Sequence, residues 1–301
     1  MREVIPRQAL VGQTIACANQ KGGVGKTTTV VNLAAYLALA GQRVLVLDLD
    51  SQGNATSGFG VDKSLVERST YDAVVDSVAL SELVLATAIE GLSVVPSSMA
   101  LAGADVELAP IAQRERQLAR LIAVIRTEYD YILLDCPPSL GLLTVNALTA
   151  ADSVLIPIQC EYYALEGLTQ LIQTVNLVRD HLNPDLAIKG VVMTMYDART
   201  NLSAEVAAEV RNHLQGAVFE TVIPRSVRLS EAPSFGLPIA LYRADSKGAT
   251  AYQALALELL ARDGRRAQAS GPVRGNASGD LTSTAAHHKS RRAAPAIGGQ
   301  S

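Results

Sequence analysis

The sequence lacks tryptophan and has only three phenylalanines and three cysteines among its 301 residues. The cysteines, Cys17, Cys136 and Cys160, are too few, and odd in number, for a disulfide framework. Apolar runs such as 44–47 and 154–158 are far shorter than the roughly 20 residues that cross a bilayer. The first ten residues have neither the apolar core nor the cleavage site of a secretory signal. These absences argue against a membrane-spanning or disulfide-rich secreted protein and favour a reducing cytoplasm.

Hydrophobic residues make up 49% of the chain and charged residues 18%. A folded chain of this length hides roughly 75% of the surface that it exposes when unfolded, so the core needs no structural metal. Charge is distributed unevenly, because residues 264–301 carry +5 and the rest of the chain carries −8. Glycine, serine, alanine and proline dominate that basic tail, and we expect it to be disordered.

Between residues 14 and 260, short apolar runs of β type alternate with helical patterns, which is typical of a parallel sheet covered on both faces. Strands are predicted at 14–18, 43–48, 92–96, 131–135, 153–158, 188–195 and 219–223, and a last helix at 247–260. We therefore expect a doubly wound, mostly parallel α/β sheet with helices on both faces. The predicted domain covers residues 13–263, between an extension at 1–12 and the tail at 264–301.

The sharpest motif is NQKGGVGKTT at residues 19–28, directly after the first predicted strand and at the start of the first helix. A glycine-rich turn at this place lets backbone N–H groups bind phosphate, and the helix N-terminus adds partial positive charge. Lys26 is predicted to reach the β- and γ-phosphates and Thr27 to bind Mg²⁺. Alternatively, the glycines only turn a strand into a helix. The predicted nucleotide contacts in this loop are Lys21, Gly22, Gly23, Val24, Gly25, Lys26, Thr27 and Thr28.

The loop departs from the ordinary pattern G-x-x-x-x-G-K-[ST], because Gln20 replaces the first glycine and Lys21 adds a second lysine. This form resembles the ParA/MinD family of P-loop ATPases, and the similarity extends over almost all of residues 13–262. In that family the lysine matching Lys21 crosses a sandwich dimer to contact the partner subunit's phosphates. The resemblance implies an ATP-dependent homodimer with ATP and Mg²⁺ as cofactors. Without it, Lys21 is an ordinary solvated lysine.

A second acidic motif, DLDSQGN at residues 48–54, resembles the family's D-x-D-P-Q-G-N, with Ser51 in place of the usual proline. Side chains alternate along a strand, so Asp48 and Asp50 can aim the same way. By resemblance, Asp50 positions and activates the attacking water, and Asp48 supports the Mg²⁺. The alternative is that both carboxylates cap the following turn. Losing the proline removes a fixed backbone angle from this loop.

The predicted strand at 131–135 ends in an acid, in the form of a Walker B element. Asp135 is expected to hold Mg²⁺ through a water molecule. Cys136 follows with no histidine or basic neighbour in sequence, which favours a small buried thiol over a nucleophile. Phosphoryl transfer to water needs positioning and charge more than covalent chemistry. The predicted catalytic residues of a slow ATPase are therefore Lys21, Lys26 and Asp50.

Two later segments, MTMYDARTNL at 193–202 and VIPRSVRLSEAPS at 222–234, resemble the chromosomal ParA/Soj subgroup. In those relatives the arginines matching Arg199 and Arg228 bind DNA phosphates, and the proline matching Pro224 lies against the adenine. Such binding ignores base sequence and weakens with salt. Without the resemblance, these arginines would be solvated loop residues. The further residues predicted on the same DNA-binding face are Arg225, Arg243 and Lys247.

The resemblance implies an ATP-dependent chromosome or plasmid partitioning protein that is cytoplasmic and associated with the nucleoid. Its ATP-bound dimer would bind double-stranded DNA, and a ParB-type centromere-binding partner would stimulate hydrolysis and release. A MinD-like membrane-associated ATPase is one alternative, although the tail from Gly264 has no amphipathic stripe with which to enter lipid. A metabolic P-loop ligase or synthetase that phosphorylates a small acid is the other.

Overall fold

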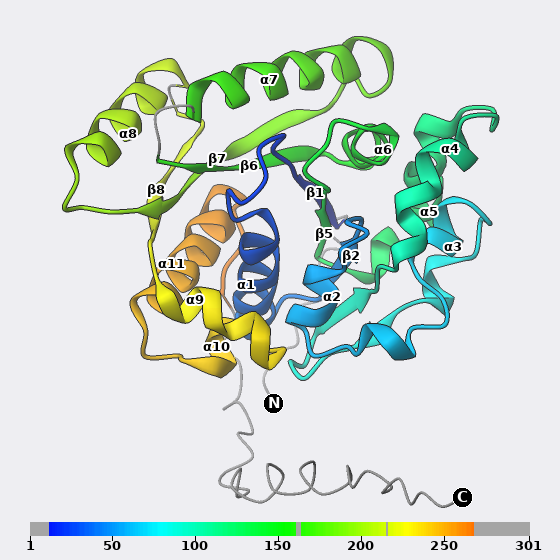
Figure 1. Cartoon of the computed structure of the whole chain (residues 1–301), viewed down its shortest axis with the longest axis horizontal. Coiled ribbons are helices and arrows are strands. Elements are labelled where there is room, and N and C mark those ends of the chain that lie inside the picture. The colour runs from blue at the N-terminus through cyan, green and yellow to red at the C-terminus, as the bar shows by residue number, and fades with distance from the viewer. Residues whose placement is uncertain (1–11, 161–163, 215, 268–301) are drawn as a thin grey trace, which may run out of the picture. The chain divides into compact units, whose positions relative to one another are not determined.

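The computed structural model describes residues 12–160, 164–214 and 216–267. Of the predicted extension at 1–12 only residue 12 falls in these ranges, and of the predicted tail at 264–301 only residues 264–267 do. Within them, the predicted doubly wound α/β sheet is confirmed (Figure 1). The sheet has the order β3-β4-β2-β5-β1-β6-β7-β8, and all neighbouring strands are parallel except β3 and β4. The strands are β1 (Gln13–Cys17), β2 (Val44–Asp48), β3 (Leu85–Ala86), β4 (Leu92–Val95), β5 (Tyr131–Asp135), β6 (Ser153–Gln159), β7 (Ala187–Tyr196) and β8 (Val218–Pro224).

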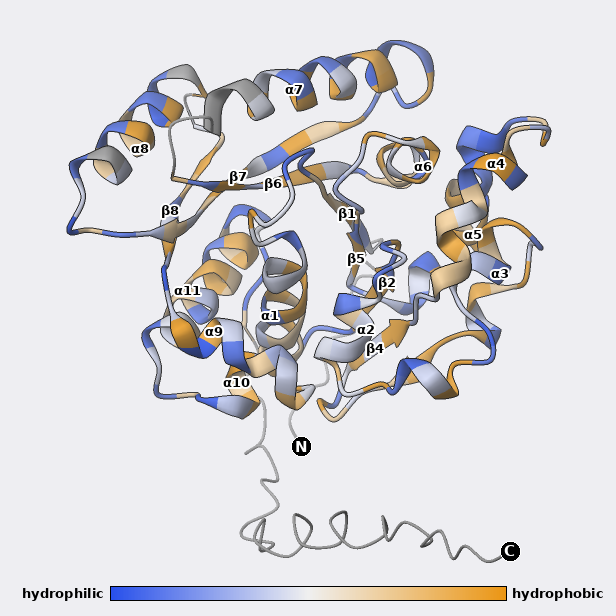
Figure 2. Cartoon of the chain, in the orientation of Figure 1, coloured by the Kyte–Doolittle hydropathy of each residue, from blue (hydrophilic) through white to orange (hydrophobic). Residues whose placement is uncertain are grey.

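The seven predicted strands appear with ends shifted by no more than one residue. The strand that the sequence does not reveal is β3, which has two exposed residues and pairs antiparallel with β4 at the sheet edge. So short a strand has no apolar run to mark it. The central strands β1, β2 and β5 are buried on both faces, which explains their almost continuous apolar sequences (Figure 2).

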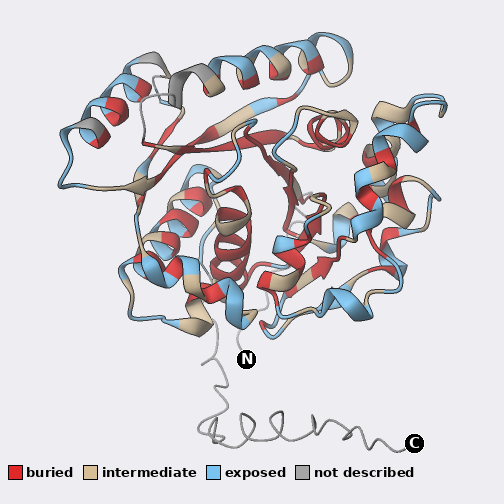
Figure 3. Ribbon diagram, in the orientation of Figure 1, coloured by how far each residue is buried: buried red, intermediate tan, exposed pale blue. Residues whose placement is uncertain are grey.

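Helices cover both faces of the sheet and enclose two apolar clusters. One cluster joins α1 and α11 to the sheet; the other joins it to α5, α6, α7 and α8 (Figure 1). Almost the whole of α1 is buried (Figure 3), because α2, α10 and α11 pack around it. Among the described residues, every helix is too short or too polar to span a lipid bilayer. The helices are α1 (Lys26–Leu39), α2 (Asn54–Gly58), α3 (Thr70–Val74), α4 (Ala104–Leu108), α5 (Gln117–Ile125), α6 (Leu142–Ala150), α7 (Ala164–His181), α8 (Asn201–His213), α9 (Val227–Glu231), α10 (Ile239–Tyr242) and α11 (Lys247–Arg262).

The register of the central strands places the predicted phosphate loop beside the predicted acids. Cys17, the last residue of β1, is level with Asp135 at the end of β5, and Asp135 is level with Asp48 at the end of β2. Parallel strands end at the same edge of a sheet, where open α/β sheets bind their ligands. The loop after β1 and both acids therefore share the carboxyl edge.

The opposite, amino edge is held by a polar network. Lys189 pairs with Asp263, and the Tyr131 hydroxyl donates to the other carboxylate oxygen of Asp263 at 2.7 Å. The Arg265 guanidinium lies 4.9 Å from the centre of the Tyr131 ring and 3.6 Å from Asp130. These contacts attach the segment after α11 to the edge of the sheet farthest from the phosphate loop.

Gly190 offers a test of the packing. A methyl group at this buried position in β7 would lie 2.6 Å from Cε2 of the Phe219 ring and 3.0 Å from the Ala217 carbonyl oxygen. Gly190→Ala should therefore lower the free energy of unfolding by roughly 1–3 kcal/mol, measured by urea denaturation. Gly103→Ala is the control, because its nearest neighbour is the mobile end of the Glu107 side chain. Equal stability of both variants would contradict the tight packing of β7 on β8.

Candidate nucleotide site and basic surface

The loop between β1 and α1 is fastened by side chains of the loop and of β7. The Asn19 amide donates to the Pro157 carbonyl at 2.7 Å, and its oxygen accepts the Lys21 backbone N–H at 3.0 Å. From β7, the buried hydroxyl of Thr194 donates to the Val24 carbonyl at 2.8 Å. The path of the loop is thus fixed by contacts with β6 and β7 within the protein itself.

Two glycines let the loop turn into α1. Gly23 and Gly25 have φ angles of +77° and +87°, in the left-handed region that glycine tolerates best. Gly25 directly precedes α1, and among the described residues no side chain caps this helix and no acid lies in its first turn. The first amides of a helix have no partner within it, and they add partial positive charge. This helix end is thus suited to an anion.

The two lysines of the loop differ in their surroundings. Lys26 is buried, and its ammonium folds back to donate to the Lys21 carbonyl at 3.2 Å. Its charge is thereby held at the loop, where a phosphate oxygen can replace that carbonyl. Lys21 is half-buried. The contact predicted for it lies between two subunits, so its role stays a prediction.

Asp135 is fully buried, and its two carboxylate oxygens have no hydrogen bond of ordinary length among the described residues. Burial raises the pKa of Asp135 well above its usual value, and the nearby charges of Asp48 and Asp50 add to this. The Thr27 hydroxyl and the Lys26 ammonium lower that pKa in part. An ionised carboxylate is costly to bury without a partner, and a cation removes much of that cost.

These residues fit Mg²⁺, since Asp135 supplies unused carboxylate oxygens and Thr27 a hydroxyl close by. No group of three or more acidic, histidine or cysteine side chains in the described ranges could hold a metal ion alone. Mg²⁺ commonly uses one or two carboxylates together with substrate phosphates and waters. The site therefore suits a metal ion that arrives with a nucleotide.

Asp48 and Asp50 differ more than the motif suggests. The buried Asp48 accepts both the backbone N–H and the hydroxyl of Thr56 on one oxygen, at 2.8 and 2.7 Å. Its other oxygen accepts the Asp50 N–H at 3.2 Å. Burial raises the pKa of Asp48 to about 6 against these hydrogen bonds. Asp50 is half-buried and accepts the Gln52 N–H at 3.0 Å. Both carboxylates thus accept hydrogen bonds that stabilise the turn after β2. Their predicted roles at the nucleotide would be additional to this structural role.

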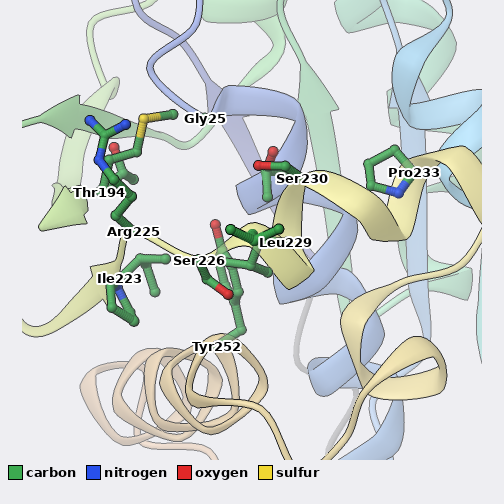
Figure 4. A pocket seen from close by; sticks show the side chains of 13 residues that line it. Gly25, Thr194, Ile223, Arg225, Ser226, Leu229, Ser230, Pro233 and Tyr252 are labelled. Carbon is green, nitrogen blue, oxygen red and sulfur yellow. The ribbon is translucent and has the colours of Figure 1, made fainter.

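A pocket of about 460 Å³ opens beside the start of α1. It is lined by Gly25 and Thr28 from the loop and helix, by Pro224 at the end of β8, and by residues of α9 and α11. In Figure 4, Tyr252 extends from α11 toward Ser226 and Leu229. The Tyr252 hydroxyl is 3.2 Å from that of Thr29, a buried residue of α1. The size and position of this pocket suit the base and sugar of a nucleotide whose phosphates lie on the loop between β1 and α1.

The predicted basic residues form two neighbouring groups. In the first, Arg199 makes a two-pronged ion pair with Asp197, with its Nε 2.9 Å from one oxygen and a terminal nitrogen 2.7 Å from the other. The Arg199 side chain is 87% exposed nonetheless. Arg199 lowers the pKa of Asp197 well below its usual value, and the charge of Arg225 contributes. Arg225 also lines the pocket.

The second group lies around Arg228, which pairs with Glu231 at 2.7 Å. The same Glu231 oxygen accepts the Tyr242 hydroxyl at 3.1 Å. Arg228 and Arg243 line a small cavity of about 280 Å³ with Asp245 and Ser246. The predicted residue Lys247 follows as the first residue of α11. The structure thus gathers Arg228, Arg243 and the start of α11, and the ion pair with Glu231 partly offsets the charge of Arg228.

Several site residues have no signature in the sequence. Thr194 lies within the segment 193–202, but nothing in the sequence indicates that it supports the phosphate loop. Met195, beside it in the pocket, has a φ of +52°, a rare angle for a residue other than glycine. Thr56 and Ser97 hold the acidic loop and have no local signature. Cys136 matches its expectation, because the thiol is buried and burial raises its pKa.

A parallel sheet with a lysine-bearing glycine loop at its carboxyl edge, a buried acid beside the loop and an adjoining base pocket defines a P-loop nucleotide-binding protein. A family model described as an AAA domain matches residues 12–188. The chain is 57% identical over 251 residues to the sporulation initiation inhibitor protein Soj of Bacillus subtilis, covering 83% of this chain and 99% of the relative.

The chain is also 53% identical over 255 residues to the chromosome partitioning protein ParA of Myxococcus xanthus, covering 85% of this chain and 90% of that protein. A solved structure of cobyrinic acid a,c-diamide synthase from Mycobacterium smegmatis, with an ATP analogue and magnesium, is 37% identical. Its TM-score is 0.74, over 87% of this chain and 100% of that one. The chain belongs to the Soj/ParA family of chromosome-partitioning ATPases. The prediction of an ATPase that uses ATP and Mg²⁺ is confirmed.

The burial of Asp135 can be tested with Asp135→Asn, which should raise the stability of the metal-free chain but reduce its stabilisation by ATP and Mg²⁺. Asp135→Asn removes an ionised group that the metal-free fold disfavours, so at pH 8 it should raise the free energy of unfolding by roughly 1–2 kcal/mol. Because a raised pKa means that the penalty disappears as the pH falls, the gain should shrink toward pH 5.

With ATP and Mg²⁺ present, the native chain should become more stable than Asp135→Asn, because only the native chain offers the carboxylate to the metal. Thermal unfolding with EDTA or with ATP and Mg²⁺ measures both effects. Asp76→Asn, at an exposed acid, is the control and should change neither. An Asp135→Asn protein that is stabilised by ATP and Mg²⁺ as strongly as the native chain would remove Asp135 from the metal site.

Proposed function

We propose that this ATPase is a nucleotide-controlled DNA-binding switch that partitions a chromosome or plasmid. ATP closes two copies into a sandwich dimer, the dimer binds double-stranded DNA without sequence preference, and a ParB-type centromere-binding protein stimulates hydrolysis and release. The observation that carries this proposal is continuity between two surfaces. The segment from Ile223 to Ser230 lines the base pocket and also supplies Arg225 and Arg228.

In the proposed reaction, Lys26 neutralises charge on the β- and γ-phosphates, and Lys21 of each subunit does so in its neighbour. Thr27, Asp135 and Asp48 support Mg²⁺, and Asp50 positions the attacking water. Pro224 lies against the base, which its place in the pocket supports. Fixed charges in a partly buried site stabilise the transition state without covalent catalysis, which suits a slow ATPase.

For DNA, the proposed contacts are phosphates bound by Arg199, Arg225, Arg228 and Lys247, with Arg243 beside them. Exposed ion pairs contribute little stability, so phosphates can replace Asp197 and Glu231 as partners at small cost. A dimer presents this surface twice, and two linked contacts bind far more strongly than one. DNA binding would then follow the nucleotide state, and in a cell the ATP form would associate with the nucleoid.

A synthetase-like activity is the second candidate, favoured by the 37% identity to the cobyrinic acid a,c-diamide synthase structure. Proteins of similar fold can catalyse different reactions, so the reaction product distinguishes the two candidate functions. Partition predicts free phosphate whose release DNA and partner stimulate, whereas a synthetase would form an acyl phosphate or an amide on a small acid.

Sedimentation with DNA tests the switch directly. Retention on DNA should be high with ATP or an uncleavable analogue and low with ADP or no nucleotide, because only the dimer presents both basic surfaces. Lys26→Ala, which should lose nucleotide binding, serves as the control that stays low in every condition. Equal retention of the native protein in all conditions would end the proposal, as would a chain that stays monomeric when saturated with the analogue.

Salt dependence tests the basic surface. Each phosphate neutralised adds about 0.9 to the slope of log affinity against log salt, so Arg228→Ala should lower that slope by about 2 for a dimer with two copies. Glu231→Gln should act oppositely and strengthen binding, because it frees Arg228 from its partner. Arg68→Ala, at an exposed arginine paired with Glu82, is the matched control. Unchanged affinity and slope in Arg228→Ala would remove Arg228 from the interface.

A further inference from the structure

A closed set of hydrogen bonds links the two acids of the β2 loop to the end of β4. The buried Thr56 hydroxyl donates to Asp48 at 2.7 Å and accepts the backbone N–H of Ser97 at 2.9 Å. The Ser97 hydroxyl then donates to the carbonyl of Asp50 at 2.5 Å, and the Asp50 N–H donates to Asp48 at 3.2 Å. Asp48, Thr56 and Ser97 each have an exposed fraction of 0%. Three of the four residues in the ring are therefore fully buried, and the fourth, Asp50, is half-buried.

The segment that carries Ser97 is itself firmly placed. It follows β4, and both the backbone N–H and the hydroxyl of Thr70 donate to the Pro96 carbonyl, at 2.8 and 3.1 Å. The neighbouring Ser98 hydroxyl lies 2.8 Å from that of Ser69, which caps α3 through a capping box. Ser97 thus joins the loop of Asp50 to a segment that is hydrogen-bonded to the start of α3.

The restraint falls on the backbone of Asp50. Its carbonyl accepts the Ser97 hydroxyl and also the Gly53 N–H at 2.8 Å, and its N–H is bound to Asp48. Both peptide groups beside its Cα are thereby oriented, which sets the direction in which the side chain leaves the chain. Ser51, which follows, lacks the fixed φ of a proline. The buried hydroxyls supply the rigidity that residue 51 does not.

We propose that Ser97 and Thr56 are positioning residues for ATP hydrolysis, which hold Asp50 at the distance and angle from the γ-phosphate that water activation needs. The inference rests on the proposed role of Asp50. Small displacements of a group that orients a reactant lower the rate strongly, while contacts that bind the nucleotide are left intact. Loss of either hydroxyl should therefore slow the chemical step without weakening ATP binding.

The test uses the full chain with Ser97→Ala, Thr56→Val and Thr56→Ser. Single-turnover hydrolysis of prebound ATP should slow on the order of tenfold in the first two variants, since a displacement near 1 Å costs up to a hundredfold. Affinity for an uncleavable ATP analogue and dimer formation should stay within about twofold of the native chain. Thr56→Ser keeps the hydroxyl and should restore most of the rate.

Ser98→Ala is the matched control, because it removes the adjacent hydroxyl, whose partner is Ser69 rather than Asp50. If its rate stays native at a thermal stability similar to that of Ser97→Ala, loosening of the loop in general is excluded. A Ser97→Ala protein that folds, binds ATP and hydrolyses it at the native rate would overturn the inference. So would an equal loss of rate in Ser98→Ala.

Asp50→Ala separates this inference from the proposed function. Full turnover in Asp50→Ala would show that the assigned role of Asp50 is wrong. If Asp50→Ala is slow while Ser97→Ala and Thr56→Val hydrolyse ATP normally, only the positioning role fails. Ser97→Ala combined with Asp50→Ala should be no slower than Asp50→Ala alone, because Ser97 acts through that carboxylate.

Discussion

A buried carboxylate at the centre of the sheet edge constrains the rest of the site. Asp135 lies between the ends of β1 and β2, and neither of its oxygens has a hydrogen bond of ordinary length among the described residues. Thr27 and Lys26 lower the pKa of Asp135, whereas the nearby charge of Asp48 raises it. The fold tolerates this arrangement because the strands around it are deeply packed. A metal ion bound to nucleotide phosphates would offset the unfavourable buried charge of Asp135. Binding of the nucleotide with its metal should therefore stabilise the folded chain.

Residues of α9 line both the base pocket and the cavity of the basic surface. Leu229 of α9 faces the pocket and packs so closely on α11 that a methyl group on Gly248 would lie 2.7 Å from its Cγ. One residue away, Arg228 faces the cavity shared with Arg243. Arg228 and Leu229 are thus neighbours in α9 that face the basic cavity and the base pocket, respectively. This adjacency gives the proposed coupling of ATP to DNA a short physical route through packed side chains.

The acidic loop shows how one set of side chains serves two purposes. Asp48 matches a motif carboxylate, yet its hydrogen bonds go to Thr56 and to the backbone of Asp50. A carboxylate has about four lone-pair sites, and these hydrogen bonds use three of those of Asp48. The synthase that shares 37% identity illustrates that a related sheet and loop occur in proteins with different names. Residues around the phosphates thus identify an ATPase more readily than they identify what it acts on.

Local sequence alone determined seven of the eight strands in the described residues, the phosphate loop and the acids at 48, 50 and 135, because apolar runs and glycine-lysine spacing are properties of neighbouring residues. The resemblance drawn from longer motifs added Pro224 and the arginines, and the structure places Pro224 in the pocket. What tertiary structure alone decided is which distant groups meet: Thr194 on the phosphate loop and Ser97 on Asp50. Ser97 lies 47 residues beyond Asp50 in the chain, and no periodicity connects them. A hydrogen bond depends on where two atoms are in space, and only the folded sheet fixes that.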